Sequence, residues 1–282
     1  MVSALGCSSP NNHLSSNYKL KEHIAFINEQ SGDWKIYTMQ SDGTDVHQII
    51  TGSSSSNLDP TWSPDGEMIA YGGNSGLDIF IVNTDGAGMI RKLTNNPLAD
   101  SEPHWSNDGK KIVFISQYEK SNEIVITDWE GNSVKQITDN DWQEATPRWS
   151  PDDNQIVFTS YRDDEWNIYS IRPDGSKEQQ LTNTSEISSN PTWSSDSSRI
   201  AFSQLHKGNW EIFVMESDGT QVRQLTENQI TDTKPIWSPD GSRIAFSSEI
   251  NGRSEIFIMD QDGKNIFSTG QSGLPSDWHS SK

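Results

Sequence analysis

A short signature, proline–any residue–tryptophan, recurs along this chain at a nearly constant interval. Its tryptophans are Trp62, Trp105, Trp149, Trp193 and Trp237, separated by 43, 44, 44 and 44 residues. Three further signatures follow in step with it: "IAF" or "IVF", then "EIFIM" and its variants, then "QLT". A period of about 40 to 45 residues indicates a fold assembled from repeated supersecondary units.

We expect each unit to contain four short β-strands, because the four segments are rich in Ile, Val, Phe, Tyr and Thr and are separated by turn residues. The strands are named A (P-x-W), B (IAF), C (EIFIM) and D (QLT). In "WSPDG", Pro64 and Gly66 favour a tight A–B turn, and Asp-Gly pairs such as Asp42-Gly43 favour a tight turn after strand C. A solenoid is the alternative, but four antiparallel strands per unit favour a β-propeller blade.

Two A–B turns depart from the pattern. "SPDD" has Asp153 and "SSDS" has Ser197 at the position of Gly66. A positive φ is tolerated by Asp and Asn and less readily by Ser, so we expect looser hairpins at these two turns.

The segment "PSDW" (Pro275–Trp278) is a strand A that has no blade of its own. Strands B, C and D occur six times, beginning at Ile24, whereas the first unit lacks a strand A. We therefore predict an all-β, six-bladed propeller over residues 23–279, with four antiparallel strands per blade, closed by the C-terminal strand completing the first blade. The extra residue in this copy of the motif predicts a β-bulge.

The tryptophans recur at two repeat positions. We expect those of the signature to be structural and to pack between adjacent sheets: Trp62, Trp105, Trp149, Trp193, Trp237 and Trp278. A second set lies just before strand C, and for it both packing and ligand stacking remain open: Trp34, Trp166 and Trp210.

The repeated pattern "QLT…P.WSPDG..IAFSS…EIFIMDQDG" resembles the WD-like repeat of the TolB-like six-bladed β-propellers, over about residues 24–278. This resemblance implies the propeller fold and is less informative about function. No G-x-S-x-G nucleophile elbow occurs, which is the motif expected of propeller-bearing peptidases.

The net charge of -19 restricts the possible partners. Nucleic acid and anionic lipid are disfavoured, because both require clustered Lys and Arg, whereas a basic segment of a partner is favoured. No histidine spacing predicts a zinc site, and we expect no cofactor beyond a divalent cation bound by carboxylates.

Binding residues are expected on the B–C and D–A loops, which share one face of the ring and vary more than the A–B and C–D turns of the other face. Candidates on the B–C loops are Tyr118, Tyr161, Arg162, His206 and Arg253. Strand A is expected to be the innermost strand of each blade, and the D–A loops have carboxylates close to it. These carboxylates are expected around the mouth of the central channel: Asp59, Asp100, Glu102, Asp141, Glu144 and Asp232. They either bind a cation or a basic segment, or form a solvated acidic surface. His104 and Arg148, at equivalent places in strand A, either approach the channel or pack between blades.

Residues 1–22 differ in character from the repeats. Small and apolar residues lead to Gly6-Cys7, and a stretch rich in Ser and Asn follows. This is similar to the end of a lipoprotein signal, with Cys7 as the lipidated residue and a flexible tether behind it. The alternative is that Cys7, the only cysteine, is an incidental thiol.

These observations favour a non-catalytic propeller of the cell envelope, periplasmic or extracellular, that binds a protein or peptide and contacts the membrane only through a lipid anchor. The alternative is a carbohydrate-active or carbohydrate-binding propeller, similar to a polysaccharide lyase or hydrolase, with its site over the channel. Loop Trp and Tyr side chains that can stack on sugar rings keep this alternative open.

Overall fold

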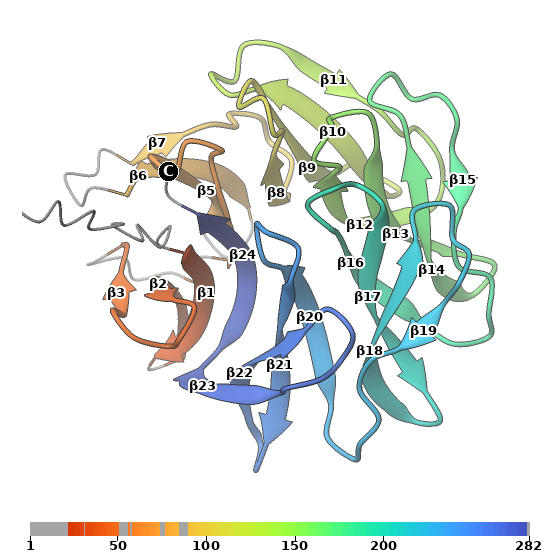
Figure 1. Cartoon of the computed structure of the whole chain (residues 1–282). Coiled ribbons are helices and arrows are strands. Elements are labelled where there is room, and N and C mark those ends of the chain that lie inside the picture. The colour runs from red at the N-terminus through yellow and green to blue at the C-terminus, as the bar shows by residue number, and fades with distance from the viewer. Residues whose placement is uncertain are drawn as a thin grey trace, which may run out of the picture.

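The computed structural model describes residues 22–30, 32–50, 56, 58–73, 77–84 and 90–280. These residues form six four-stranded antiparallel sheets, arranged radially as the blades of a propeller (Figure 1). The predicted fold is therefore confirmed. The described part of the chain contains no helix of the length and apolarity needed to cross a membrane. The segment with Cys7 lies outside the described residues.

Blade 1 combines the last strand of the chain with the first three, in the order β24 (Leu274–Ser280), β1 (Glu22–Gln30), β2 (Asp33–Gln40) and β3 (His47–Gln48). The other blades each use four consecutive strands. Blade 2 contains β4 (Leu58–Trp62), β5 (Met68–Gly73), β6 (Asp78–Asn83) and β7 (Arg91–Lys92). Blade 3 contains β8 (Asp100–Trp105), β9 (Lys111–Gln117), β10 (Asn122–Asp128) and β11 (Val134–Gln136).

The remaining blades complete the ring. Blade 4 contains β12 (Gln143–Trp149), β13 (Ile156–Arg162), β14 (Glu165–Ile171) and β15 (Gln179–Gln180). Blade 5 contains β16 (Ser188–Trp193), β17 (Arg199–His206), β18 (Asn209–Glu216) and β19 (Arg223–Gln224). Blade 6 contains β20 (Asp232–Trp237), β21 (Arg243–Ile250), β22 (Arg253–Asp260) and β23 (Phe267–Ser272).

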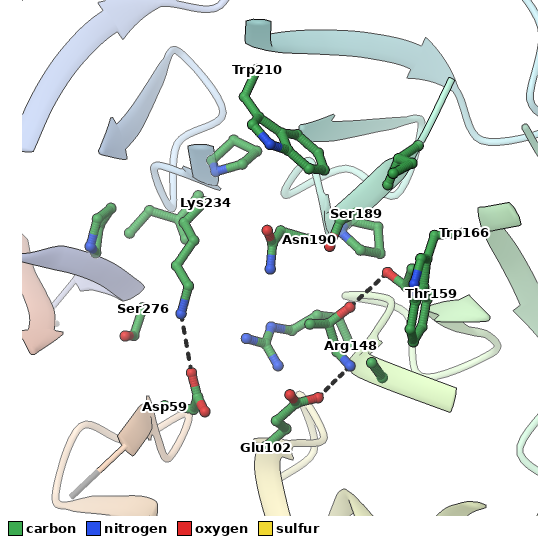
Figure 2. A pocket seen from close by; sticks show the side chains of 17 residues that line it. Asp59, Glu102, Arg148, Thr159, Trp166, Ser189, Asn190, Trp210, Lys234 and Ser276 are labelled. Carbon is green, nitrogen blue, oxygen red and sulfur yellow. Dashed lines mark hydrogen bonds and ion pairs between the residues drawn. The ribbon is translucent and has the colours of Figure 1, made fainter. Parts of the chain in front are cut away.

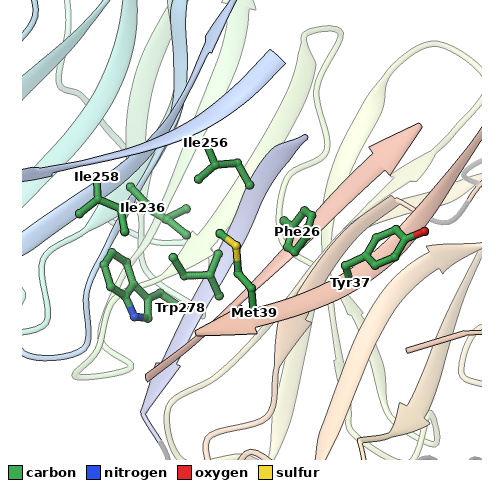
Figure 3. Packing of buried hydrophobic residues seen from close by; sticks show 9 residues of the cluster. Phe26, Tyr37, Met39, Ile236, Ile256, Ile258 and Trp278 are labelled. Carbon is green, nitrogen blue, oxygen red and sulfur yellow. The ribbon is translucent and has the colours of Figure 1, made fainter. Parts of the chain in front are cut away.

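Ring closure occurs where β24 pairs with β1, as predicted. Trp278 lies opposite Ile24, and the register shifts between Ala25 and Phe26, so that the extra residue of "PSDW" forms a β-bulge. Trp278 is only 6% exposed and packs in one cluster with Ile236 and with side chains of blades 1 and 6 (Figure 3). The two ends of the repeat region therefore share one sheet and one apolar core.

The core lies between neighbouring blades and consists mainly of side chains from strands B and C. The aromatic residues of "IAF" and "IVF" are fully buried, and they are Phe26, Phe114, Phe158, Phe202 and Phe246. Among the signature tryptophans, Trp62 is partly buried and the other five are buried. Each blade thus contributes the same apolar wedge, which explains the constant repeat length.

The two irregular A–B turns do not form looser hairpins. Asp153 and Ser197 have φ values of 57° and 60°, and each N–H donates to the serine carbonyl three residues earlier, as Gly66 does. The reason is a Ser–Asp lock that every copy retains. In the Ser197 turn, Ser194 Oγ donates to Asp196 at 2.6 Å and accepts from the Arg199 N–H at 2.9 Å.

Candidate functional site

Five of the six inner strands have a backbone irregularity directly before the signature proline. One non-glycine residue there has a positive φ, and two residues of strand A lie opposite one residue of strand B. The residues with positive φ are Asp59, Glu102, Thr146, Asn190 and Lys234. The bulge turns their side chains out of the sheet and towards the axis of the ring.

These five side chains line a cavity of about 500 Å³, here named the mouth cavity, at the inner ends of the D–A loops (Figure 2). The indole rings of Trp166 and Trp210 lie on its wall and Ser276 lies on the opposite side. All six blades contribute lining residues, so the cavity is the opening of the central channel on the face of the B–C and D–A loops.

The mouth cavity contains charges of both signs. Lys234 Nζ lies 3.4 Å from Asp59 Oδ1, so this carboxylate is paired across the channel. Glu102 Oε2 accepts a short hydrogen bond from the Thr146 N–H. Burial inside the channel, and secondly the charge of Asp59, raise the pKa of Glu102 above its ordinary value. The mouth is therefore of mixed charge and not simply acidic.

Three residues line both the mouth cavity and a second cavity of about 350 Å³ at the A–B turns, here named the turn cavity. They are Arg148, Ile236 and Ser276, and they form the waist of the channel. In Figure 2 the Arg148 guanidinium reaches into the space between Glu102 and Asn190. A cation thus occupies the centre of the ring.

His104 lines the turn cavity beside the waist. Its Nδ1 accepts a hydrogen bond of 3.2 Å from the Trp149 N–H. Burial, and secondly the charge of Arg148, hold the pKa of His104 well below its usual value. A neutral imidazole that accepts at Nδ1 has its proton on Nε2, so His104 presents a donor there.

Four of the six carboxylates expected at the mouth lie elsewhere. Asp100, Glu144 and Asp232 are buried and do not line the cavity. Each accepts a hydrogen bond from an asparagine four residues earlier, and Asp100 also accepts from Ser116 Oγ at 2.6 Å. Asp141 is exposed and lies 3.6 Å from Lys120 Nζ. Only Asp59 and Glu102 of the expected set are brought together at the mouth.

The B–C loop candidates are dispersed. Arg162 is held by Glu144 at 3.4 Å and by Glu178, and its guanidinium stacks on a tyrosine ring. His206 Nδ1 lies 2.9 Å from Glu186.

The remaining loop candidates differ in burial. Tyr161 packs on Trp166 with ring centroids 5.3 Å apart, and Tyr118 packs against the core cluster between blades 2 and 3. Arg253 is exposed.

Sequence reasoning missed Thr146, Asn190 and Lys234. The signal that identifies them is their repeat position, because each directly precedes a signature proline as Asp59 and Glu102 do.

The second tryptophan set divides between two environments. Trp166 and Trp210 line the mouth cavity, whereas Trp34 packs in the core cluster between blades 1 and 2.

Three D–A loops of the same face have an apolar side chain at one repeat position. Trp142 and Ile230 occupy one repeat position in two D–A loops and are 38% and 39% exposed. Leu98 occupies that position in a third loop and is partly buried. Within the described ranges, no group of three or more His, Cys, Asp or Glu is arranged to hold a metal ion.

The family model of the TolB beta propeller domain matches residues 20–139, 72–186 and 117–275. A search of curated proteins found no match. The TolB structure from Acinetobacter baumannii aligns with a TM-score of 0.76 at 22% identity over 92% of this chain and 66% of that protein. A TolB structure from Agrobacterium tumefaciens aligns with a TM-score of 0.73 at 21% identity over 92% and 93% of the two chains.

A more distant similarity extends to an enzyme. The oligogalacturonate lyase of Vibrio parahaemolyticus aligns with a TM-score of 0.61 at 14% identity, over 90% of this chain and 82% of that one. This chain spans slightly less than two thirds of the Acinetobacter protein. At these identities the structural similarities establish the fold alone.

Proposed function

The chain belongs to the TolB beta-propeller family, and from this premise we propose that it is a non-catalytic ring that binds a protein or peptide in the cell envelope. The observation that carries the proposal is the composition of one face. Two exposed apolar side chains of the D–A loops, Trp142 and Ile230, lie on the same face as the mouth cavity, whose lining combines charged and aromatic side chains. A concave site of mixed lining with exposed apolar side chains on the same face suits contact with a folded partner or an inserted segment.

The rigidity of the scaffold supports the same function. The loops of this face are held by partly buried hydrogen bonds, such as that from Asn228 Nδ2 to Asp232 at 2.8 Å. A surface whose backbone is already ordered loses little conformational entropy on binding, which favours affinity.

The proposed location is the outer side of the cytoplasmic membrane, with a lipid at Cys7 and the following residues as a tether. The family match supports the envelope as the compartment. Stable anchoring requires more than one acyl chain, because a single chain binds membranes only marginally.

A second candidate is the binding of an acidic carbohydrate in the mouth cavity. The side chains that favour it are Trp166 and Trp210, whose rings lie on the cavity wall beside a central guanidinium (Figure 2). Indole faces stack on sugar rings and a guanidinium binds uronate carboxylates.

Site-specific photocrosslinking tests the protein-binding function. A benzophenone amino acid replaces Trp142 or Ile230 on the face of the mouth, or Val222 or Ile266 on the C–D turns of the opposite face. All four side chains are at least 38% exposed, so the variants are matched in accessibility. Irradiation in envelope preparations should give a discrete adduct from the first pair and none from the second. Equal labelling from both faces, or none from either, would contradict the proposal.

A further inference from the structure

Arg148 has more hydrogen-bond donors than acceptors around it. Its guanidinium has five N–H donors. Only one hydrogen bond from it to a described residue is formed, from Nη1 to the carbonyl oxygen of Pro147 at 3.0 Å. No carboxylate lies within ion-pair distance of it among the residues that the structure describes. The side chain is half-buried in the channel, where solvation by bulk water is reduced.

Two more donors face the same part of the channel. The hydroxyl of Ser276, in a residue that is 8% exposed and lines both cavities, has no hydrogen-bond partner. His104, which lines the turn cavity beside Arg148, has its proton on Nε2 because Nδ1 accepts from Trp149. Three different blades thus provide hydrogen-bond donors at one level of the ring, and Arg148 and Ser276 have donors that are not used within the described residues.

The neighbouring carboxylates already accept other hydrogen bonds. Asp59 is paired with Lys234. Glu102 accepts from the Thr146 N–H, and Asp277 accepts from the Trp62 N–H and from Thr61 Oγ1. These bonds hold the carboxylates against the wall, and Glu102 and Asp277 remain within electrostatic reach of Arg148 without forming an ion pair with it.

We propose that the waist of the channel binds the carboxylate of a peptide that enters through the mouth cavity, with Arg148 as the bidentate donor and His104 and Ser276 as flanking donors. This inference rests on the proposed protein-binding function and names the chemical group that the site recognises. A planar guanidinium matches the geometry of a carboxylate, and such charge-assisted pairs are stronger than neutral hydrogen bonds. The negative charge of the whole protein opposes an anionic ligand at long range, and the short-range pair with Arg148 inside the ring has to outweigh this repulsion.

The mouth cavity favours a peptide over a free inorganic anion. It provides about 500 Å³ above the waist, enough for a few residues, and Trp166 and Trp210 line its wall. These indoles would contact an apolar side chain next to the carboxylate. Asn190 and Thr146 lie beside that path and can bond to a peptide backbone.

The test compares two probes that differ in one group. N-acetyl-L-tryptophan has the carboxylate, and N-acetyl-L-tryptophanamide replaces it with a neutral amide. Titrations followed by calorimetry and by the Arg Nε–H resonances should show the acid binding at least about tenfold more tightly, with one arginine resonance shifting. Arg148→Gln should remove the difference, whereas Arg172→Gln, an exposed arginine in a C–D turn, should retain it.

Two further peptide probes distinguish a side-chain carboxylate from a C-terminal one. A conservative variant controls for loss of binding that is caused by misfolding. A Trp-Glu dipeptide with both ends blocked reports on a side-chain carboxylate, and a Trp-Gly peptide with a free C-terminus reports on a terminal one. Arg148→Lys keeps the positive charge but loses the pair of parallel N–H donors. Its preference for the acid over the amide should therefore lie between those of the unmodified protein and of Arg148→Gln. The probe comparison on the unmodified protein requires no variant.

Several results would overturn the inference. These are equal affinities for acid and amide, no binding of the acid at about 10 mM, or a preference for the acid that survives Arg148→Gln. Tighter binding of trigalacturonate than of either peptide would overturn the peptide assignment. Crosslinking from the mouth face without a carboxylate preference would retain the proposed function and reject this inference. Binding of the acid without a crosslinked partner would reject the proposed function instead.

Discussion

Asp277 binds the backbone of Trp62, a residue 215 positions earlier in the chain. Its Oδ2 accepts a hydrogen bond of 2.8 Å from the Trp62 N–H and one of 3.0 Å from Thr61 Oγ1. The contact crosses from blade 1 to blade 2, so the last strand joins two blades through its side chains as well as its backbone. His104 makes the equivalent bond to the Trp149 N–H, from blade 3 to blade 4.

Asp277→Ala should weaken ring closure. The variant leaves the partly buried Trp62 N–H without its acceptor, which should lower the free energy of unfolding by about 1–3 kcal/mol. Urea unfolding measures the loss, and amide exchange at Trp62 should accelerate more than exchange in blade 4. Asp277→Asn retains one acceptor oxygen and should lose less. Unchanged exchange at Trp62 would show that the contact does not hold the seam.

Ser197→Gly should stabilise the protein. Ser197 has a φ of 60°, which glycine adopts without steric cost, and the structure gives its side chain no hydrogen bond. Relief of this strain should add about 1 kcal/mol to the free energy of unfolding, visible as a Tm increase of about 2 °C. A lower Tm would mean that the serine side chain contributes more than its backbone strain costs.

Asp153→Gly should have the opposite effect, although Asp153 also has a positive φ of 57°. Its carboxylate accepts from the N–H groups of Asn107 and Asp108 at 2.7 and 2.9 Å, which links blades 4 and 3. Loss of both bonds should outweigh the relief of strain and destabilise the protein by about 1 kcal/mol. Asp153→Asn, which keeps one oxygen and tolerates this backbone, is the control. Equal stabilisation by both glycine variants would contradict the contrast.

Glu144→Gln should change the pH dependence of stability. Burial raises the pKa of Glu144 from 4.5 to about 7, and the nearby charge of Glu123 contributes in the same direction. The folded state therefore holds this proton more tightly than the unfolded chain does. The corresponding stabilisation is complete below about pH 4.5 and is lost as the pH rises through 7.

The variant has no proton to lose, so its stability relative to the parent should rise between pH 4.5 and 8, by up to about 3 kcal/mol. Urea unfolding at several pH values measures this difference. Glu119→Gln, at an exposed position, should show no such trend. A difference that is flat with pH would mean that Glu144 is ionised throughout.

Trp149→Ala should lower the free energy of unfolding by about 3–5 kcal/mol, because it removes a buried ring from the interface of two blades. Trp142→Ala, seven residues earlier and 38% exposed, should cost less than about 1 kcal/mol. Denaturant unfolding of both variants separates the two repeat positions. Similar losses of stability in the two variants would contradict the distinction between the buried position of Trp149 and the exposed position of Trp142.

The fold was predictable because the closing strand repeats the signature of the other inner strands. Trp278 identifies "PSDW" as a strand A, and the first unit, from Ile24, lacks one. The hairpins at Asp153 and Ser197 were harder to judge from residue type, because the Ser–Asp lock compensates for the missing glycine. Counting turn residues alone underestimates such a lock.

The site was only partly predictable, as Asp100 and Glu102 illustrate. They lie two residues apart, so a regular strand would place both on one face. The bulge between Ser101 and His104 breaks this alternation, and Glu102 enters the channel while Asp100 stays buried against Ser116. A left-handed residue before a proline causes the bulge, and residues before proline ordinarily favour extended backbone.

The bulged strands separate the shape of this ring from its chemistry. Asp, Glu, Thr, Asn and Lys occupy one equivalent backbone position in five blades, with φ values from 48° to 55°. Acidic, basic and neutral side chains therefore occupy this position with the same backbone conformation. Ligand preference can therefore be reprogrammed one side chain at a time, by selection or by design, while the disc beneath stays the same.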